Sequence, residues 1–191
     1  MGDVEKVKEE AMQILGASEV LPKLVVFDLD YTLWPFYCEC RSKREMPSLY
    51  PHATGILLAL KQKGIHLAIA SRSPTPHIAS SFLNKLNLNS IFVAQEIFSS
   101  WTHKTDHFQK IHSTTGVPFN SMLFFDDENR NIQALSCKSG MIGIIGIKDG
   151  SDKHLGWEWG QPWSTKRRAY KILSKLECIS EEQAEMVGQV L

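Results

Sequence analysis

Polar side chains that can bind a metal ion or a phosphate group follow several short apolar stretches of this sequence. The stretches are 24–27, 67–70 and 122–125, and the polar residues directly after them are Asp28, Ser71 and the pair Asp126 and Asp127. Short apolar runs of this kind are typical of strands that are buried on both faces of a parallel sheet. Ligands of open parallel sheets bind beyond the carboxyl ends of the strands, so we expect these side chains to meet at one edge.

The expected edge is strongly acidic. Asp28 and Asp30 lie two residues apart, and a second acidic pair follows a neighbouring strand. So much negative charge is unfavourable without a cation, because each carboxylate raises the pKa of the others. Carboxylate oxygens suit a hard divalent ion, and Mg²⁺ needs only one or two of them together with water and a phosphate oxygen. Lys104 adds a cation and Ser71 a hydroxyl group, and both suit a phosphate group.

The elements that would position these residues alternate between strand and helix. Apolar runs predict strands at 24–27, 67–70, 91–94, 122–125 and 141–147. Helical patterns, several of them bounded by Pro or Gly, predict helices at 3–17, 52–63, 76–86, 105–115 and 128–137. This alternation predicts an α/β fold, a Rossmann-like three-layer sandwich with a central parallel sheet.

The overall composition excludes two classes of protein. The 191 residues include 21 Lys and Arg and 21 Asp and Glu, so the formal net charge is zero. A protein that binds nucleic acid by coating its phosphates would show a basic excess. No apolar run approaches the roughly 18 residues of a membrane span. We therefore expect a globular protein that binds neither nucleic acid nor membrane.

The cysteines and the N-terminus favour the cytoplasm. The four cysteines are Cys38, Cys40, Cys137 and Cys178, and we interpret them as reduced thiols. Residues 1–10 are charged and acidic, which does not suit a secretory signal. We expect a cytoplasmic protein, and a monomer.

These residues and their order resemble the haloacid dehalogenase superfamily of phosphohydrolases. Four motifs between residue 24 and about residue 132 carry the resemblance: D-x-D-x-T at 28–32, Ser71, Lys104 ahead of a helix, and the acidic pair at 126–127. The stretches VFDLDYTLWPF (26–36), Ser71-Arg72 and FFDDENRNI (124–132) are similar to magnesium-dependent phosphatases within that superfamily. The resemblance implies a Mg²⁺-dependent phosphatase.

The resemblance also implies a role for each motif residue. Asp28 would attack phosphorus and form an aspartyl-phosphate, and Asp30 would act as the acid and then as the base. The Asp28 side chain, the Asp30 backbone carbonyl and Asp126 would hold Mg²⁺. Asp127 would orient Lys104 or a metal-bound water, and Thr32 would fix the loop that carries the two aspartates. The residues expected to bind the substrate or its phosphate are Leu29, Asp30, Tyr37, Ser71, Arg72 and Lys104.

Chain lengths between the motifs predict an open site. Residues 21–165 would form the phosphatase core, with helical extensions at 1–20 and 166–191. Caps of this superfamily are inserted after the first motif or after the third strand, and neither 32–66 nor 94–104 leaves room for one. An open site admits a phosphorylated small molecule or a phosphoprotein, including phosphotyrosine and protein-linked sugar phosphates such as fructosamine phosphates.

Several alternatives stay open at this point. The whole chain could be a non-catalytic scaffold of the same fold that binds phosphate. Asp127 and Ser71 could each cap the helix that follows, because both residue types are favoured caps. Lys104 could be a solvated surface lysine. His103 and His107 would share a helical face and suit zinc, although no third ligand of convincing spacing lies nearby.

Overall fold

A single parallel sheet forms the centre of the molecule. The computed structural model describes residues 2–139 and 142–145. The strands are β1 (Leu24–Phe27), β2 (His66–Ser71), β3 (Ala94–Ile97), β4 (Met122–Asp126) and β5 (Ile142–Ile145). Their order across the sheet is β3-β2-β1-β4-β5, and all four pairings are parallel. The first strand of the chain is therefore the central strand of the sheet.

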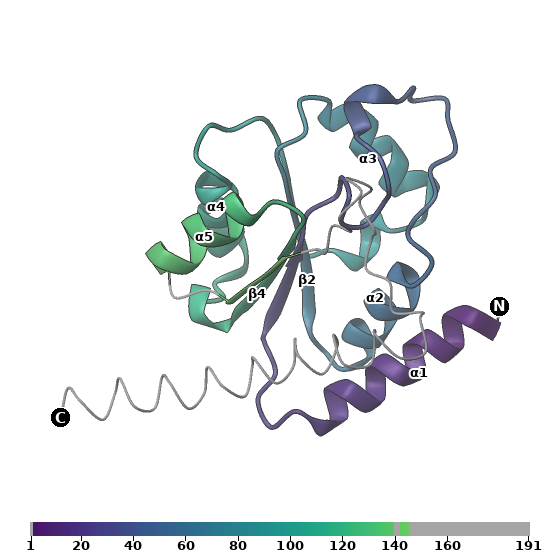
Figure 1. Cartoon of the computed structure of the whole chain (residues 1–191), viewed down its shortest axis with the longest axis vertical. Helices are drawn as coiled ribbons and strands as arrows, with labels where there is room; N and C mark the ends of the chain where they lie inside the picture. The colour runs from purple at the N-terminus through teal and green to yellow at the C-terminus, as the bar shows by residue number, and fades with distance from the viewer. Residues whose placement is uncertain (1, 140–141, 146–191) are drawn as a thin grey trace.

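Helices cover both faces of the sheet, as Figure 1 shows. One face carries α1 (Gly2–Ala17), α2 (Ala53–Gln62) and α3 (Pro76–Lys85), and the other carries α4 (Thr105–Thr115) and α5 (Asn129–Ser139). Short 3₁₀ helices lie at Cys38–Cys40, Asn89–Ile91 and Phe119–Ser121. The predicted three-layer α/β fold is confirmed. Among the described residues, no helix has the length and apolar character that a membrane span requires.

The pairing and burial of strand β1 explain why the residues that follow β1 and β4 lie at one edge of the sheet. Val25 and Phe27 face the core beneath α1, α2 and α3, while Leu24 and Val26 face the core beneath α4 and α5. Burial on both faces explains the continuous apolar run in the sequence. Phe27 pairs with Phe125 of β4, so the residues that follow these two strands emerge together at the same edge of the sheet.

One predicted strand is wrong, and the other elements agree closely. The helices lie within two residues of their predicted bounds. The apolar run at 91–94, however, is not a strand, because Ile91 ends a 3₁₀ helix and β3 begins only at Ala94. As an edge strand, β3 carries the half-buried polar residues Gln95 and Glu96, so its sequence lacks the apolar run of a central strand. The expected C-terminal extension at 166–191 lies outside the described residues.

Helix α1 packs closely against α2. Val7, Ala11 and Leu15 of α1 are buried. A Cβ atom on Gly55 of α2 would lie 2.8 Å from the backbone carbonyl oxygen of Val4 and 2.7 Å from a methyl carbon of Val7. Only glycine allows this approach, because the backbone of α1 would have to move to admit a methyl group.

Gly55→Ala is expected to lower the free energy of unfolding by about 1–3 kcal/mol, because overpacking separates α1 from α2. Urea unfolding followed by circular dichroism measures the change. Gly16→Ala is the matched control, since its added Cβ would meet only the end of Lys63, at 3.7 Å. Alanine favours a helix over glycine by up to about 1 kcal/mol, so this control should be neutral or stabilising. Equal effects of the two substitutions would contradict the close packing.

Candidate active site

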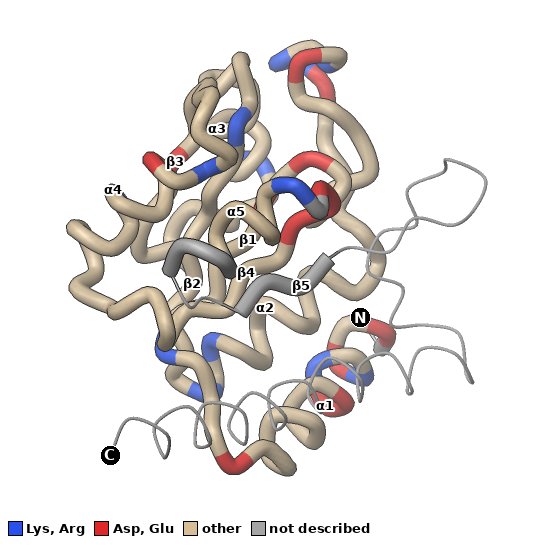
Figure 2. The backbone as a smooth tube through the Cα atoms, turned by 60° about the vertical axis from the view of Figure 1, so that its left-hand side comes forward, with Lys and Arg blue, Asp and Glu red and all other residues tan. Residues whose placement is uncertain are grey.

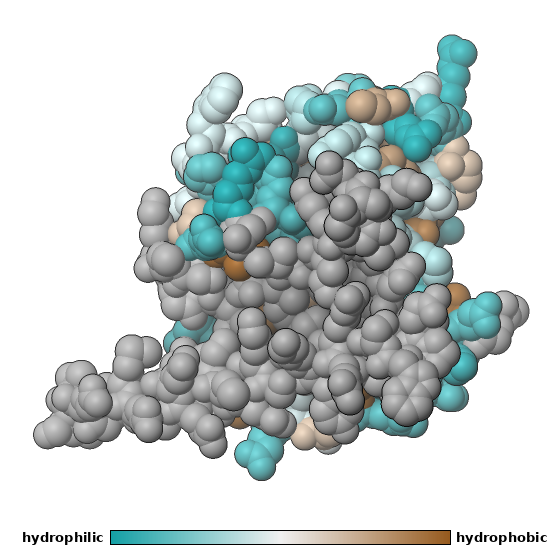
Figure 3. Space-filling model, viewed as in Figure 1, coloured by the Kyte–Doolittle hydropathy of each residue, from teal (hydrophilic) through white to brown (hydrophobic). Residues whose placement is uncertain are grey.

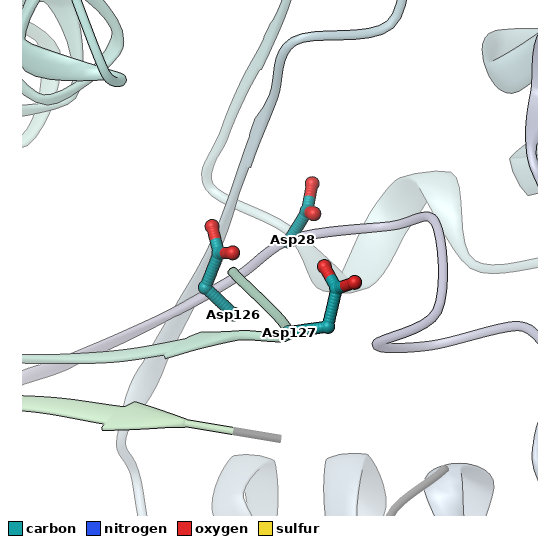
Figure 4. A group of neighbouring side chains, drawn as sticks. All are labelled: Asp28, Asp126 and Asp127. Carbon is teal, nitrogen blue, oxygen red and sulfur yellow. The ribbon is translucent and has the colours of Figure 1, made fainter. Parts of the chain in front are cut away.

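Three buried carboxylates meet at the carboxyl edge of the sheet. Asp28 follows β1, Asp126 ends β4, and Asp127 comes next in the chain. One carboxylate oxygen of each lies within 4.8 Å of those of the other two. Their side chains point to the same side, beyond the strand ends (Figure 4). An all-oxygen donor set of this kind fits a hard divalent cation such as Mg²⁺.

Lys104 lies buried against this cluster, with an exposed fraction of only 1%. Its Nζ is 2.9 Å from Oδ1 of Asp28 and 2.6 Å from Oδ2 of Asp126. The alternative of a solvated surface lysine is therefore wrong. The backbone before α4 makes this placement possible, because both His103 (φ 48°) and Lys104 (φ 68°) adopt the left-handed region. His103 is consequently outside the helix and does not share a helical face with His107.

Burial controls the ionisation of this cluster. It raises the pKa of Asp28 to about 8, and the charge of Asp126 adds to the rise while that of Lys104 opposes it. Burial also disfavours the Lys104 ammonium, but the carboxylates of Asp126 and Asp28 outweigh it and raise the Lys104 pKa. One buried cation thus faces three carboxylates, and a divalent cation would bring the cluster closer to neutrality.

Asp126 is fixed by donors from α5 and from Lys104. Its Oδ1 accepts a hydrogen bond from the backbone N–H of Glu128 at 2.7 Å. The buried Asn131 side-chain amide lies 3.1 Å and 3.0 Å from its two oxygens. The sequence left open that Asp127 caps the helix that follows. In the structure, Asp126 accepts a backbone N–H group of this kind, that of Glu128 just before α5. The sequence analysis assigned no role to Asn131, although this residue lies within the stretch 124–132 that carries the family resemblance.

The loop after β1 holds Asp30 at the entrance of the site. Oδ1 of Asp30 accepts hydrogen bonds from Nε1 of Trp34 at 2.7 Å and from the backbone N–H of Cys38 at 3.2 Å. Burial raises the pKa of Asp30, although these two hydrogen bonds oppose the rise. A raised pKa suits a carboxyl group that must donate a proton near neutral pH.

Two predicted site residues support this loop from within the core. Leu29 is fully buried, and its carbonyl oxygen accepts backbone hydrogen bonds from Thr32, Leu33 and Trp34. Thr32 is also fully buried, and its hydroxyl has no hydrogen-bond partner among the described residues. Neither side chain lines the pocket at the strand ends. Leu29 can therefore reach a phosphate group only through its backbone.

An open pocket brings most of the other predicted residues together. The predicted residues that line it are Asp28, Asp30, Tyr37, Ser71, Arg72, Lys104 and Asp127. Sequence reasoning missed five further lining residues: Glu39, Ser73, Pro74, Glu128 and Asn131. Hydrophilic side chains gather beside the start of α5 on the face seen in Figure 3, and acidic and basic positions lie next to one another there in Figure 2.

The pocket wall combines an ion pair with an aromatic pair. Nη2 of Arg72 lies 2.9 Å from Oε2 of Glu128, which links the end of β2 to the start of α5. Tyr37 is 45% exposed, and its ring meets the Tyr31 ring edge to face, with 4.6 Å between centroids. Beyond its acidic floor, the pocket thus offers a paired guanidinium and an exposed aromatic surface.

Solved structures share this fold. A haloacid dehalogenase superfamily hydrolase from Ehrlichia chaffeensis aligns with a TM-score of 0.58 at 16% identity, covering 82% of this chain and 98% of that one. The N-terminal part of a Bacteroides fragilis protein, which contains a phosphatase domain complexed with Mg, aligns with a TM-score of 0.51 at 15% identity. This second match covers 76% of this chain and 40% of the other. The fold is that of the haloacid dehalogenase hydrolases.

Sequence comparison defines the family more narrowly. The acid phosphatase family matches residues 20–156. Human magnesium-dependent phosphatase 1 is 39% identical over 131 residues, which are 61% of this chain and 73% of that protein. A HAD-like hydrolase superfamily protein of Schizosaccharomyces pombe is 37% identical over 134 residues, covering 58% of this chain and 78% of its own length. The chain belongs to the acid phosphatase family, and the resemblance drawn from its motifs is confirmed.

Proposed function

We propose that the protein hydrolyses phosphate monoesters through an aspartyl-phosphate on Asp28, with Mg²⁺ as its cofactor. One observation carries this proposal. The Asp28 carboxylate lies at the floor of an open pocket, 2.9 Å from the buried Lys104 ammonium and within 4.8 Å of two further carboxylates. A nucleophile, a cation for the phosphate group and a set of metal ligands thus share one small volume.

The carboxylates of Asp28 and Asp126, with the backbone carbonyl of Asp30, would hold Mg²⁺. The name of the human relative states magnesium dependence, and the Bacteroides fragilis structure contains Mg. When bound, Mg²⁺ supplies positive charge that offsets the charge of the phosphoryl oxygens. Asp127, which belongs to the same carboxylate cluster and lines the pocket, would orient Lys104 or a metal-bound water.

Side chains of this pocket would carry out two steps, the formation of the aspartyl-phosphate and its hydrolysis. An oxygen of Asp28 attacks phosphorus while the bond to the leaving oxygen breaks, and Asp30 donates its proton to that oxygen. Asp30 then takes a proton from the water molecule that attacks the aspartyl-phosphate, which releases phosphate and restores Asp28. The Ser71 hydroxyl and the Lys104 ammonium hold the phosphoryl oxygens through both steps.

The pocket suits substrates with a large leaving group. The described residues contain no cap over the strand ends, and the exposed Tyr37 ring lies at the pocket wall. An aromatic ring on the substrate can pack against it edge to face or in offset stacking. We therefore propose phosphotyrosine and phosphorylated sugars, free or attached to protein, as the substrate classes.

Hydrolysis of p-nitrophenyl phosphate tests the proposal most directly. Purified protein should release p-nitrophenol with Mg²⁺ present and stop when EDTA removes the ion, and adding Mg²⁺ back should restore the rate. If folded protein shows no turnover with p-nitrophenyl phosphate, phosphotyrosine or sugar phosphates and any divalent ion, the proposed activity is wrong. Binding of inorganic phosphate without turnover would then identify a phosphate-binding scaffold.

Asp126→Asn is expected to raise the Mg²⁺ concentration for half-maximal activity at least about tenfold, because one charged ligand is lost. A Mg²⁺ titration of the initial rate measures it. Glu96→Gln is the control, since it removes a carboxylate that lies on β3, outside the pocket. The same Mg²⁺ requirement in wild type and Asp126→Asn would show that Asp126 does not bind the metal.

A further inference from the structure

His107 is a buried titratable residue that the reaction above does not use. It lies on the first turn of α4, three residues after Lys104, and has no exposed surface. Its ring stacks on that of Phe98, with 3.8 Å between centroids and an interplanar angle of 1°. A buried imidazole must satisfy its polar ring nitrogens, so the hydrogen bonds of His107 indicate what it does.

The hydrogen bonds of His107 define its protonation state. Nε2 lies 2.9 Å from the backbone carbonyl oxygen of Ser71 and 2.9 Å from that of Phe98. Carbonyl oxygens only accept hydrogen bonds, so Nε2 carries a proton that both of them share. Nδ1 is buried without a hydrogen-bond partner among the described residues. Burial lowers the pKa of the ring to about 4, which keeps His107 neutral near pH 7.

These contacts join the end of β2 to two segments that follow much later in the chain, the start of the loop before α4 and the first turn of α4. The carbonyl of Ser71, at the end of β2, also accepts the backbone N–H of Phe98 at 3.1 Å. Phe98 begins the loop that leads from β3 to α4, and this loop ends at Lys104. The His107 ring therefore ties the end of β2 and the start of this loop to the first turn of α4.

The backbone of the loop before α4 requires contacts that hold it in place. His103 and Lys104 both have positive φ values, a conformation that residues other than glycine rarely adopt. Strained backbone of this kind persists only where the surrounding contacts hold it in place. The ion pairs of Lys104 fix its ammonium group, and the bonds of His107 fix the backbone on either side of the loop.

We propose that His107 is a positioning residue, whose Nε2–H holds the Ser71 hydroxyl and the Lys104 ammonium at the correct separation for one phosphate group. Ser71 ends β2, whereas Lys104 ends the loop between β3 and α4. His107 bonds the backbone carbonyl of Ser71 and lies three residues after Lys104. This inference rests on the proposed function, because it assigns both groups to the same phosphate.

His107→Phe and His107→Gln separate positioning from packing. Phenylalanine keeps an aromatic ring beside Phe98 but removes the donor, so kcat/KM for p-nitrophenyl phosphate should fall about 10- to 100-fold. Glutamine places an N–H group at a similar reach and should restore the value to within about fivefold of wild type. Ile111→Val, an equally buried change one turn further along α4, should leave kcat/KM unchanged.

With an active wild type, three outcomes would overturn the inference. These are wild-type activity in His107→Phe, an equal loss in His107→Gln and His107→Phe, or ¹⁵N NMR of the wild type that places the ring proton on Nδ1. The NMR measurement can refute the inference even if the phenylalanine variant does not fold. If the wild type binds phosphate but shows no turnover, the proposed function alone fails. Weaker binding of inorganic phosphate by His107→Phe than by His107→Gln would then still support the positioning role, and equal binding would refute it.

Discussion

Asp28→Asn abolishes turnover of p-nitrophenyl phosphate, with an expected fall in kcat of about 10⁴-fold or more, as for the loss of other enzyme nucleophiles. The amide of asparagine is a poor nucleophile, so no acyl phosphate forms. Asparagine has nearly the same volume as aspartate, and the backbone N–H of residue 28 still bonds the carbonyl of Phe125. The fold should therefore persist, and circular dichroism checks that it does.

The intermediate itself gives a second measurement of the same prediction. Wild-type protein quenched in acid during turnover should carry one added phosphoryl group by mass spectrometry, and hydroxylamine should remove it because acyl phosphates react with this reagent. Asp28→Asn should show no such adduct, whereas the Glu96→Gln control should behave as wild type. A folded Asp28→Asn protein with a tenth or more of the wild-type rate would rule out Asp28 as the nucleophile.

Lys104→Met lowers the free energy of unfolding in EDTA by about 3–5 kcal/mol, the range for breaking a buried ion pair from one side. Methionine preserves much of the side-chain volume but leaves Asp28 and Asp126 without their shared cation. Saturating Mg²⁺ should recover part of the loss, since a bound cation replaces the missing charge. Urea unfolding with and without Mg²⁺ measures both effects.

Lys110→Met on the same helix is the matched control. The Lys110 side chain is 59% exposed, and its Nζ lies 3.9 Å from Oε2 of Glu96. Exposed pairs of this kind contribute about 0–1 kcal/mol, so the change should be small. If the two lysine variants unfolded at the same urea concentration, Lys104 would not be neutralising the buried carboxylates.

Part of the site could be predicted from the sequence because it follows buried strands. Asp28, Ser71 and Asp126 each come directly after apolar residues that face two cores, and such runs identify central strands of a parallel sheet. The same reasoning misplaced β3, because an edge strand needs fewer apolar residues and the apolar run 91–94 extends from the end of a 3₁₀ helix to the first residue of the strand. The positions of β1, β2 and β4 were thus predictable, because strands buried on both faces must consist of apolar residues.

The remaining contacts depend on tertiary structure that no spacing encodes. Lys104 reaches the cluster through two left-handed residues, which the sequence S-S-W-T-H-K does not reveal. Glu39 and Asn131 enter the pocket from elements that meet it only after folding. The sequence suggests His107 as half of a possible zinc pair, whereas in the structure its Nε2 bonds two backbone carbonyls.

The parallel topology also determines how the site can be gained and lost. Asp28, Ser71 and Asp126 come from the ends of three strands, and Lys104 comes from the loop that follows a fourth. No hairpin, helix pair or other local fragment contains this combination, so the site assembles only after pairings between distant parts of the chain have formed. A nascent or partly unfolded chain is accordingly inert towards phosphate esters. Folding of the whole sheet is therefore a precondition for catalysis in this molecule.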